Sequence, residues 1–376
     1  MAAAIREARS AGRRLYDLTT SNPTVCGFEY DAGAILTPLS DARALVYDPD
    51  PRGMRSARVA VAEYYRGHGA AVDPDALVLT TSTSEAYGYL FRLLCDAGDE
   101  VLVAQPSYPL FDFLADLEDV RLRPYPLFYD YGWWIDFAEL ERRIGPRTRA
   151  IVVVHPNNPT GHGTKTAERL RLEQICVRHG LVLIVDEVFL DYPLRRTDLE
   201  ELTSFAVGPH PAVTFVLSGM SKIAGLPQMK AAWIAGFGPE PVRQQAMGRL
   251  EVIADTFLSM NAPVQMALPH WLKSCDRIQK QILERVRMNL ACAEASGVEV
   301  LRVEAGWCAI LRLPRMRKEG NMAEELLNQC GVVVHPGSFY GLAEEGRVVV
   351  SLIGPLNDFS VGMERIASFV ETNRIS

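Results

Sequence analysis

Short apolar runs alternate with amphipathic stretches along most of the chain. The apolar runs are predicted to be buried strands, because they are rich in β-branched residues and end in small or polar ones. They cover residues 76–81, 100–104, 120–124, 150–155 and 181–186. Helical stretches lie between them, among others at 82–95, 137–143 and 167–179. This alternation predicts an α/β fold with a mostly parallel sheet sandwiched by helices.

The pattern changes after about residue 260. A long helical stretch at 261–296 is followed by short strands at 298–303, 307–313 and 347–352. A chain of 376 residues is also long for one compact domain. We therefore expect a large domain over residues 46–265, and a smaller α+β domain from both termini, over residues 1–45 and 266–376.

The composition narrows the functional classes. A net charge of −7 gives no electrostatic basis for binding nucleic acid or an anionic membrane. Seven cysteines without a C-x-x-C pair argue for reduced thiols and against a zinc site, so we expect a cytoplasmic protein without a metal. No apolar run approaches the length of a membrane span. With 48% hydrophobic and 23% charged residues, the chain resembles an ordinary globular enzyme.

One lysine stands in an unusual place. An apolar run at 212–218 ends in small residues, presents Lys222 and is followed by a second apolar run at 231–235. Lys222 is thus predicted at the end of a buried strand, where an ammonium must find a partner or lose its proton. Such a side chain either extends to the surface or serves as a desolvated nucleophile that forms a Schiff base.

Polar residues also follow other predicted strands. Ser82, Thr83 and Ser84 begin a helix, where backbone N–H groups and hydroxyls form either an anion site or a plain N-cap. Tyr108 follows the next strand and offers either a stacking ring or core packing. Ligands of open α/β sheets bind at this carboxyl edge.

Two further side chains belong to the same predicted edge. Two prolines and a glycine fix the loop at 155–161 and direct the Asn158 amide outward. Asp186 ends a wholly apolar strand, where its carboxylate either binds a cation or caps a neighbouring loop. A phosphate site, an aromatic ring, an amide, a carboxylate and a lysine are together what holding pyridoxal 5′-phosphate requires.

The motifs resemble a known family. Asn157-Asn158-Pro159-Thr160-Gly161, Asp186-Glu187-Val188-Phe189 and Ser221-Lys222 occur in the order and spacing of the class I/II aminotransferases, fold type I enzymes of the aspartate aminotransferase superfamily. The resemblance extends over nearly the whole chain. It implies a pyridoxal phosphate-dependent enzyme that moves an amino group between an amino acid and a 2-oxo acid.

The resemblance also implies a role for each residue. Lys222 would carry the cofactor as a Schiff base and shuttle a proton, and Asp186 would pair with the pyridinium nitrogen. Asn158 would donate to the ring hydroxyl and Tyr108 would stack on the ring. The remaining residues would hold the phosphate: Ser82, Thr83, Ser84, Lys230 and Tyr47. Tyr47 resembles a tyrosine that reaches the neighbouring subunit, which implies a homodimer.

Three departures from the family concern the cofactor. Lys230 lies eight residues after Lys222, where the family commonly has an arginine on the phosphate, so the charge is kept without the bidentate fork. Phe189 replaces a tyrosine that bonds the ring hydroxyl and lacks the group to do so. Gly219 replaces a common serine, with Ser218 one place away.

A fourth departure concerns the substrate. The family normally has an arginine two residues before Ser351 that binds the substrate α-carboxylate, but the chain has Val349 there. Arg347 lies two places earlier, on the same face of a predicted strand, so it is a candidate replacement. Together with Phe189, this departure keeps open a lyase or a racemase on the same fold.

Two readings from other classes fit less well. The run 181–187 resembles the acidic strand of a P-loop nucleotidase, but no G-x-x-x-x-G-K-[ST] accompanies it. A regulator that only binds the cofactor would need a DNA-binding module, and only about 45 residues precede the large domain.

Overall fold

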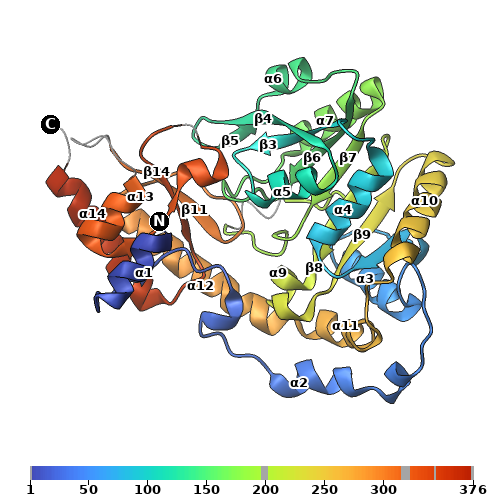
Figure 1. The fold of residues 1–376 in the computed structure, drawn as a ribbon, viewed down its shortest axis with the longest axis horizontal. Coiled ribbons are helices and arrows are strands. Elements are labelled where there is room, and N and C mark those ends of the chain that lie inside the picture. The colour runs from blue at the N-terminus through green and yellow to red at the C-terminus, as the bar shows by residue number, and fades with distance from the viewer. Residues whose placement is uncertain (1, 196–201, 315–321, 343, 374–376) are drawn as a thin grey trace.

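The computed structural model describes residues 2–195, 202–314, 322–342 and 344–373. Its centre is an eight-stranded sheet in the order β2-β9-β8-β7-β6-β3-β4-β5 (Figure 1). The strands are β2 (Leu77–Thr80), β3 (Glu100–Gln105), β4 (Arg121–Tyr129), β5 (Trp133–Ile135), β6 (Thr148–Val154), β7 (Val182–Asp186), β8 (Thr214–Gly219) and β9 (Ala232–Phe237).

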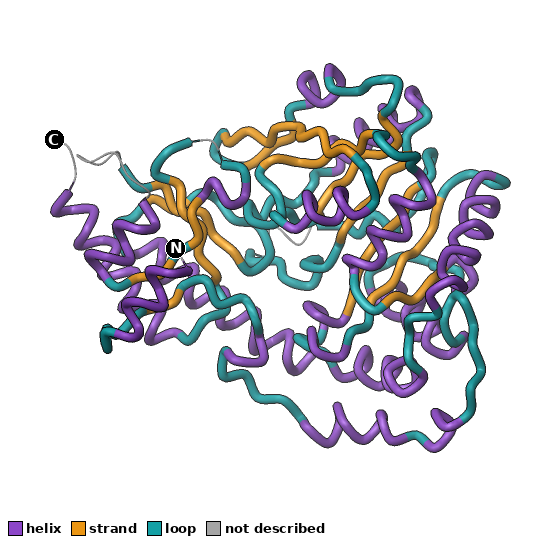
Figure 2. The backbone as a smooth tube through the Cα atoms, viewed as in Figure 1, coloured by secondary structure: helices purple, strands orange, loops and turns teal. Residues whose placement is uncertain are grey.

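The predicted mostly parallel sheet is confirmed. Neighbours from β4 through β3, β6 and β7 to β8 pair in parallel. β9 runs antiparallel between β8 and β2, and β5 folds back antiparallel on β4. Figure 2 shows these strands side by side with helices around them. Parallel strands bring the loops after β6, β7 and β8 to one edge of the sheet.

Alternating residues along each strand face two different helix layers, as the two-residue period of a strand requires. On β7, Ile184 packs with residues of α4 (Thr83–Leu94), α5 (Leu110–Leu117) and α10 (Val242–Phe257). Leu183 and Val185 face the opposite layer. That layer contains α3 (Arg55–Gly67), α7 (Thr166–His179) and α11 (Ala262–Ser274). Both faces of the sheet are therefore covered, which explains the wholly apolar strands.

A second, smaller assembly contains both ends of the chain (Figure 1). Its antiparallel sheet has the order β10-β11-β14-β13, and β1 pairs in parallel with β12. The strands are β1 (Tyr16–Asp17), β10 (Glu299–Val300), β11 (Cys308–Arg312), β12 (Val332–Val333), β13 (His335–Pro336) and β14 (Arg347–Ser351). The helices are α1 (Ala2–Ser10), α12 (Asp276–Ala295), α13 (Met322–Glu325) and α14 (Leu356–Asn373).

The structure differs from the predicted elements in two places. β4 continues to Tyr129 and turns into β5, which the sequence did not indicate. The helical stretch at 261–296 is divided into α11 and α12 at Cys275. The predicted domain boundary between residues 265 and 266 falls inside α11, and α11 packs on α3 in the large assembly.

Candidate active site

Asp186 and Lys222 lie at the carboxyl ends of neighbouring strands. Asp186 is the last residue of β7 and is in register with Leu217 on β8. Lys222 lies in α9 (Met220–Ile223), the short helix that begins where β8 ends. The predicted meeting of a carboxylate and an amine at this edge is therefore present in the fold.

Asp186 is a buried carboxyl group with two neutral donors. Its Oδ1 accepts the Val188 backbone N–H at 3.1 Å, and its Oδ2 accepts the Tyr87 hydroxyl at 3.2 Å. Burial raises the pKa of Asp186 to about 6, although both hydrogen bonds oppose the rise. Among the described residues no cation forms an ion pair with it, although the nearby Lys222 ammonium also opposes the rise.

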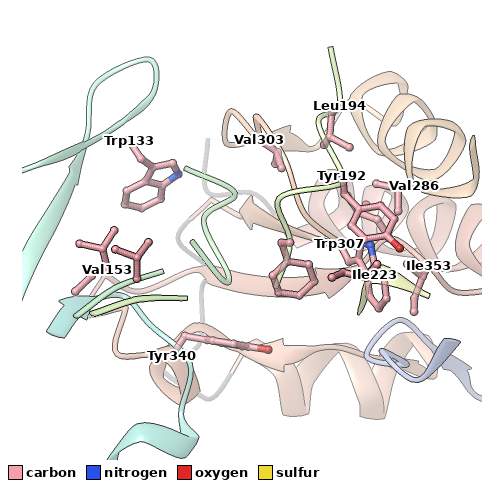
Figure 3. Close-up of a cluster of buried hydrophobic side chains, with 14 of the residues drawn as sticks. Trp133, Val153, Tyr192, Leu194, Ile223, Val286, Val303, Trp307, Tyr340 and Ile353 are labelled. Carbon is pink, nitrogen blue, oxygen red and sulfur yellow. The ribbon is translucent and has the colours of Figure 1, made fainter. Parts of the chain in front are cut away.

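Lys222 is held against aromatic rings. Its Nζ lies 4.9 Å from the centre of the Trp307 ring and 5.5 Å from that of Phe189. Burial lowers the pKa of Lys222, as a nucleophilic amine requires. Its backbone carbonyl accepts the Tyr192 hydroxyl at 2.6 Å, which fixes the start of the loop. Figure 3 shows Trp307 and Tyr192 together in the buried cluster that adjoins the lysine.

The residues at the start of α4 divide between two roles. Ser82 is the N-cap, and its Oγ accepts the Glu85 backbone N–H at 3.1 Å. Thr83 and Ser84 form the first turn and are only partly buried. The capping interpretation is thus confirmed for Ser82, and the hydroxyls of Thr83 and Ser84 stay candidates for a phosphate.

The loop after β6 uses its two asparagines differently. The Asn157 side chain accepts the Thr160 hydroxyl at 2.8 Å and so braces the loop. The Asn158 Oδ1 is buried and has no hydrogen-bond partner. The His155 backbone N–H donates to the Asp186 carbonyl at 2.8 Å, so this loop lies directly beside the carboxylate.

Tyr108 lies on the loop after β3. Its ring is 45% exposed and makes an edge contact with Phe111 at 6.2 Å between centres. Burial of its hydroxyl raises its pKa, and the Asp186 carboxylate adds to the rise, so the two side chains are close enough to interact. A half-exposed ring near the carboxylate leaves one face open to a ligand.

The presence of a glycine at position 219, instead of the family's serine, has a steric explanation. A Cβ at this position would lie 2.8 Å from the Ala232 Cβ and 2.9 Å from the Ala231 carbonyl oxygen. A serine at 219 would therefore clash with β9. The neighbouring Ser218 keeps a buried Oγ without a partner.

The contacts among the described residues do not place Lys230 or Tyr47 at this site. Lys230 is exposed, in a left-handed conformation with φ of 53°. Tyr47 is 82% exposed and lines another cavity, of about 410 Å³, with residues such as Leu45, Tyr89 and Met260. Neither Asp186 nor Lys222 lines that cavity.

The arrangement fits pyridoxal phosphate. In the described part of the chain, Asp186 and Lys222 attract one another electrostatically, but neither forms an ion pair, although Asp186 is buried and Lys222 partly so. A ring with a protonated nitrogen at one end and an aldehyde carbon at the other would satisfy both groups. The unpartnered Asn158 Oδ1 and the open Tyr108 ring lie beside them.

The site defines a class of enzyme, and a family model identifies it. The model for "Aminotransferase class I and II" matches residues 37–355, so the chain belongs to this family, whose members depend on pyridoxal phosphate. The chain is 25% identical to the alanine aminotransferase of Mycobacterium tuberculosis (strain ATCC 25618 / H37Rv) over 379 residues, which cover 96% of this chain and 87% of that protein.

A second relative matches a shorter part of the chain. The glutamate-pyruvate aminotransferase AlaA of Escherichia coli (strain K12) is 27% identical over 258 residues, or 68% of this chain. The chain spans 63% of the length of that relative. Among solved structures, an alanine aminotransferase from Pyrococcus furiosus superposes with a TM-score of 0.89 at 21% identity, covering 99% of this chain and 96% of that one. This confirms the fold.

Three residues of the site were missed by sequence reasoning. Tyr87 contacts Asp186 from α4, while Trp307 and Tyr192 contact Lys222 and its carbonyl. Tyr87 is one turn beyond the helix start, and Trp307 follows a loop of the small assembly. No local pattern marks either residue, because their contacts are with residues far away in the sequence.

Proposed function

We propose that this protein is a pyridoxal phosphate-dependent aminotransferase that moves an amino group between an amino acid and a 2-oxo acid. The observation that carries the proposal is that Asp186 and Lys222 lie at adjacent strand ends and attract one another electrostatically, yet form no ion pair with any described residue. The relatives named for alanine, glutamate and pyruvate make small amino and 2-oxo acids the first substrates to test.

Each side chain has a task in this proposal. Asp186 would hold the protonated ring nitrogen of the cofactor, and Tyr87 keeps that carboxylate in place. Lys222 would hold the cofactor through a Schiff base between Nζ and the aldehyde carbon, formed with loss of water, and would move the proton that leaves the substrate Cα. Bound pyridoxal phosphate supplies the electron sink for this proton transfer. Asn158 and Tyr108 hold the ring hydroxyl and the ring face, and Thr83, Ser84, Lys230 and Tyr47 hold the phosphate, with Ser82 fixing the helix start.

A lyase or racemase is the second candidate, because one departure concerns the substrate carboxylate and another the ring hydroxyl of the cofactor. Val349 is fully buried where the family has its carboxylate-binding arginine. Phe189 packs at 5.5 Å on Trp307 and brings no hydroxyl to the cofactor. Both changes alter how the substrate's Cα bonds are held relative to the ring, which decides the bond that breaks.

Absorbance of the protein loaded with pyridoxal phosphate tests the proposal. We expect alanine or glutamate to convert the cofactor to its amino form, and pyruvate to reverse the change. Lys222→Ala should abolish both conversions while still binding the cofactor weakly, and Lys222→Arg should do the same with the charge kept. Keto acid released without the amino form would favour a lyase, and full turnover by Lys222→Ala would exclude the proposed role.

We further propose that the chain is a cytoplasmic homodimer. An exposed apolar segment supports the dimer, with Leu45 at 90%, Val46 at 65% and Tyr47 at 82% exposure. Unpaired thiols at all seven cysteines support a reducing compartment. Of the helices that the structure describes, none is long and apolar enough to cross a membrane.

The two-domain division also stays a proposal, with one adjustment. Pairing of β1 with β12 supports a small domain built from both ends of the chain. Because α11 packs on α3, we place the end of the large domain after α11, near Cys275, instead of at residue 265.

A further inference from the structure

The guanidinium of Arg347, the candidate replacement for an arginine at position 349, already has partners in the structure. Its guanidinium pairs with the Glu344 carboxylate and lies 5.8 Å over the Trp133 ring. It is also four residues from Ser351 along β14, a distance of about 13 Å in an extended strand. Arg347 is therefore engaged at the far end of the strand.

His335 lies on the face of the sheet where the family's arginine would be. It is the direct antiparallel partner of Val349, and residues directly opposite one another project to the same face. Ser351 is on that face two residues further along β14, opposite Cys308. His335 is thus about 7 Å from the level of Cys308 and Ser351.

The Cys308 end of this face adjoins the lysine. Burial raises the pKa of the Cys308 thiol to about 12, and the Lys222 ammonium opposes this rise, so the two side chains are close. Trp307, the preceding residue, already contacts the Lys222 amine. The face that carries His335 therefore leads to the reacting amine.

Aromatic side chains connect His335 to the mouth of the site. Its ring stacks on Phe339 at 5.4 Å and meets the edge of Tyr340 at 5.8 Å. The Tyr340 carbonyl accepts the Ser107 backbone N–H at 3.0 Å, which places this segment against the Tyr108 loop. Figure 3 shows the Tyr340 hydroxyl directed toward the side where Trp307 and Ile223 lie. The imidazole is thus held against Phe339 and Tyr340, in a segment that is bonded to the Tyr108 loop.

We propose that His335 binds the substrate α-carboxylate by a hydrogen bond from its imidazole, in place of an arginine at position 349. An imidazole offers an N–H donor in either protonation state. This inference rests on the proposed function only in taking Lys222 as the reacting amine.

The test compares two variants of the cofactor-loaded enzyme. His335→Phe keeps a ring that can stack on Phe339 but removes the N–H, whereas His335→Gln keeps a donor. We expect His335→Phe to raise KM for alanine about tenfold or more, the usual effect of losing a hydrogen bond to a charged group, with a smaller change in kcat. His335→Gln should stay within a few-fold of the wild type. The cofactor absorbance should be unchanged in both.

Two further measurements separate this role from a structural one. Isopropylamine lacks a carboxylate, so the slow conversion of this amine should have the same rate in the wild type and in His335→Phe. The dissociation constant of propionate, followed by cofactor absorbance without turnover, should rise as KM does. An equal loss for isopropylamine, or unchanged propionate binding, would overturn the assignment. A wild type that binds propionate but transfers no amino group would instead refute the proposed function.

Discussion

At the scale of single residues, the site is built from a buried carboxyl group and a partly buried amine that form no ion pair among the described residues. The unfolded chain would ionise Asp186 near pH 3.8, whereas burial raises its pKa in the folded protein to about 6. The folded protein therefore holds a proton that the unfolded chain has lost between these two values. Such a cost is typical of functional carboxyl groups, which are kept ready for a ligand that is not part of the chain.

The free-energy cost of burying the Asp186 carboxylate predicts that replacing this residue changes the stability of the cofactor-free protein in a pH-dependent way. Above pH 6 the Asp186 carboxylate is charged and buried, so Asp186→Asn should raise the free energy of unfolding by about 2–3 kcal/mol at pH 7. The gain should shrink as the pH falls through 6 and vanish near pH 4, where the carboxyl group is protonated in both states. Denaturant unfolding at several pH values measures it.

Two comparisons make that result specific. Asp116→Asn, an exposed position on α5, should change stability little at any pH. Asp186→Asn should also bind pyridoxal phosphate more weakly than the wild type, because the amide cannot neutralise a protonated ring nitrogen. A variant that is less stable at pH 7, or that binds the cofactor equally well, would contradict the role of this carboxylate.

At the scale of elements, the start of α4 separates capping from binding. Ser82→Ala removes the Oγ that accepts the Glu85 N–H, so it should lower the free energy of unfolding by about 1 kcal/mol. Ser84→Ala removes a partly buried hydroxyl in the first turn and should leave stability almost unchanged while weakening cofactor binding several-fold. Thermal unfolding without cofactor and absorbance titration with it give the two quantities.

The opposite ranking would show that the two serines have exchanged roles. If Ser84→Ala destabilises the cofactor-free protein and Ser82→Ala alone weakens cofactor binding, the hydroxyls are assigned wrongly. Thr83→Ser, which keeps a hydroxyl, serves as the matched control for both measurements.

The sequence predicted elements well where local pattern decides them. β7 and β8 were found because both faces of each strand are covered by helices, which makes them wholly apolar. β5 was missed because only three residues pair, and Pro124 and Pro126 interrupt the pattern of its partner β4. Motif spacing placed Asp186 and Lys222 correctly at one edge. Tyr87 and His335 could not be found in this way, since their roles depend on pairing between distant segments.

At the scale of the whole molecule, the N-terminal segment joins both assemblies. It starts beside the small sheet, where β1 pairs with β12, and then passes α2 (Ala32–Leu36), which packs on α11 (Figure 1). Next it leads through the exposed Leu45, Val46 and Tyr47 to α3. Three consecutive exposed apolar side chains beside a cavity of about 410 Å³ are costly on a monomer. A second copy of the chain would cover them.

This geometry predicts that Tyr47 serves the site of its partner, and hybrid dimers test it. Tyr47→Phe and Lys222→Ala are each expected to have little activity as pure dimers. In a hybrid dimer, one site would combine an intact Lys222 with an intact Tyr47 from the other subunit. Since about half of randomly mixed dimers are hybrids with one working site of two, mixing should restore about a quarter of wild-type activity.

The same mixture distinguishes the alternatives. If Tyr47 acts within its own subunit, no hybrid contains a complete site, and refolding the two variants together restores nothing. If the chain is a monomer, sedimentation gives the 41.7 kDa mass of one chain and mixing again has no effect. Refolding Lys222→Ala with wild type is the control, because it should lower activity only in proportion to the wild-type chains replaced. Recovery in the first mixture alone would establish that the exposed tyrosine crosses the interface.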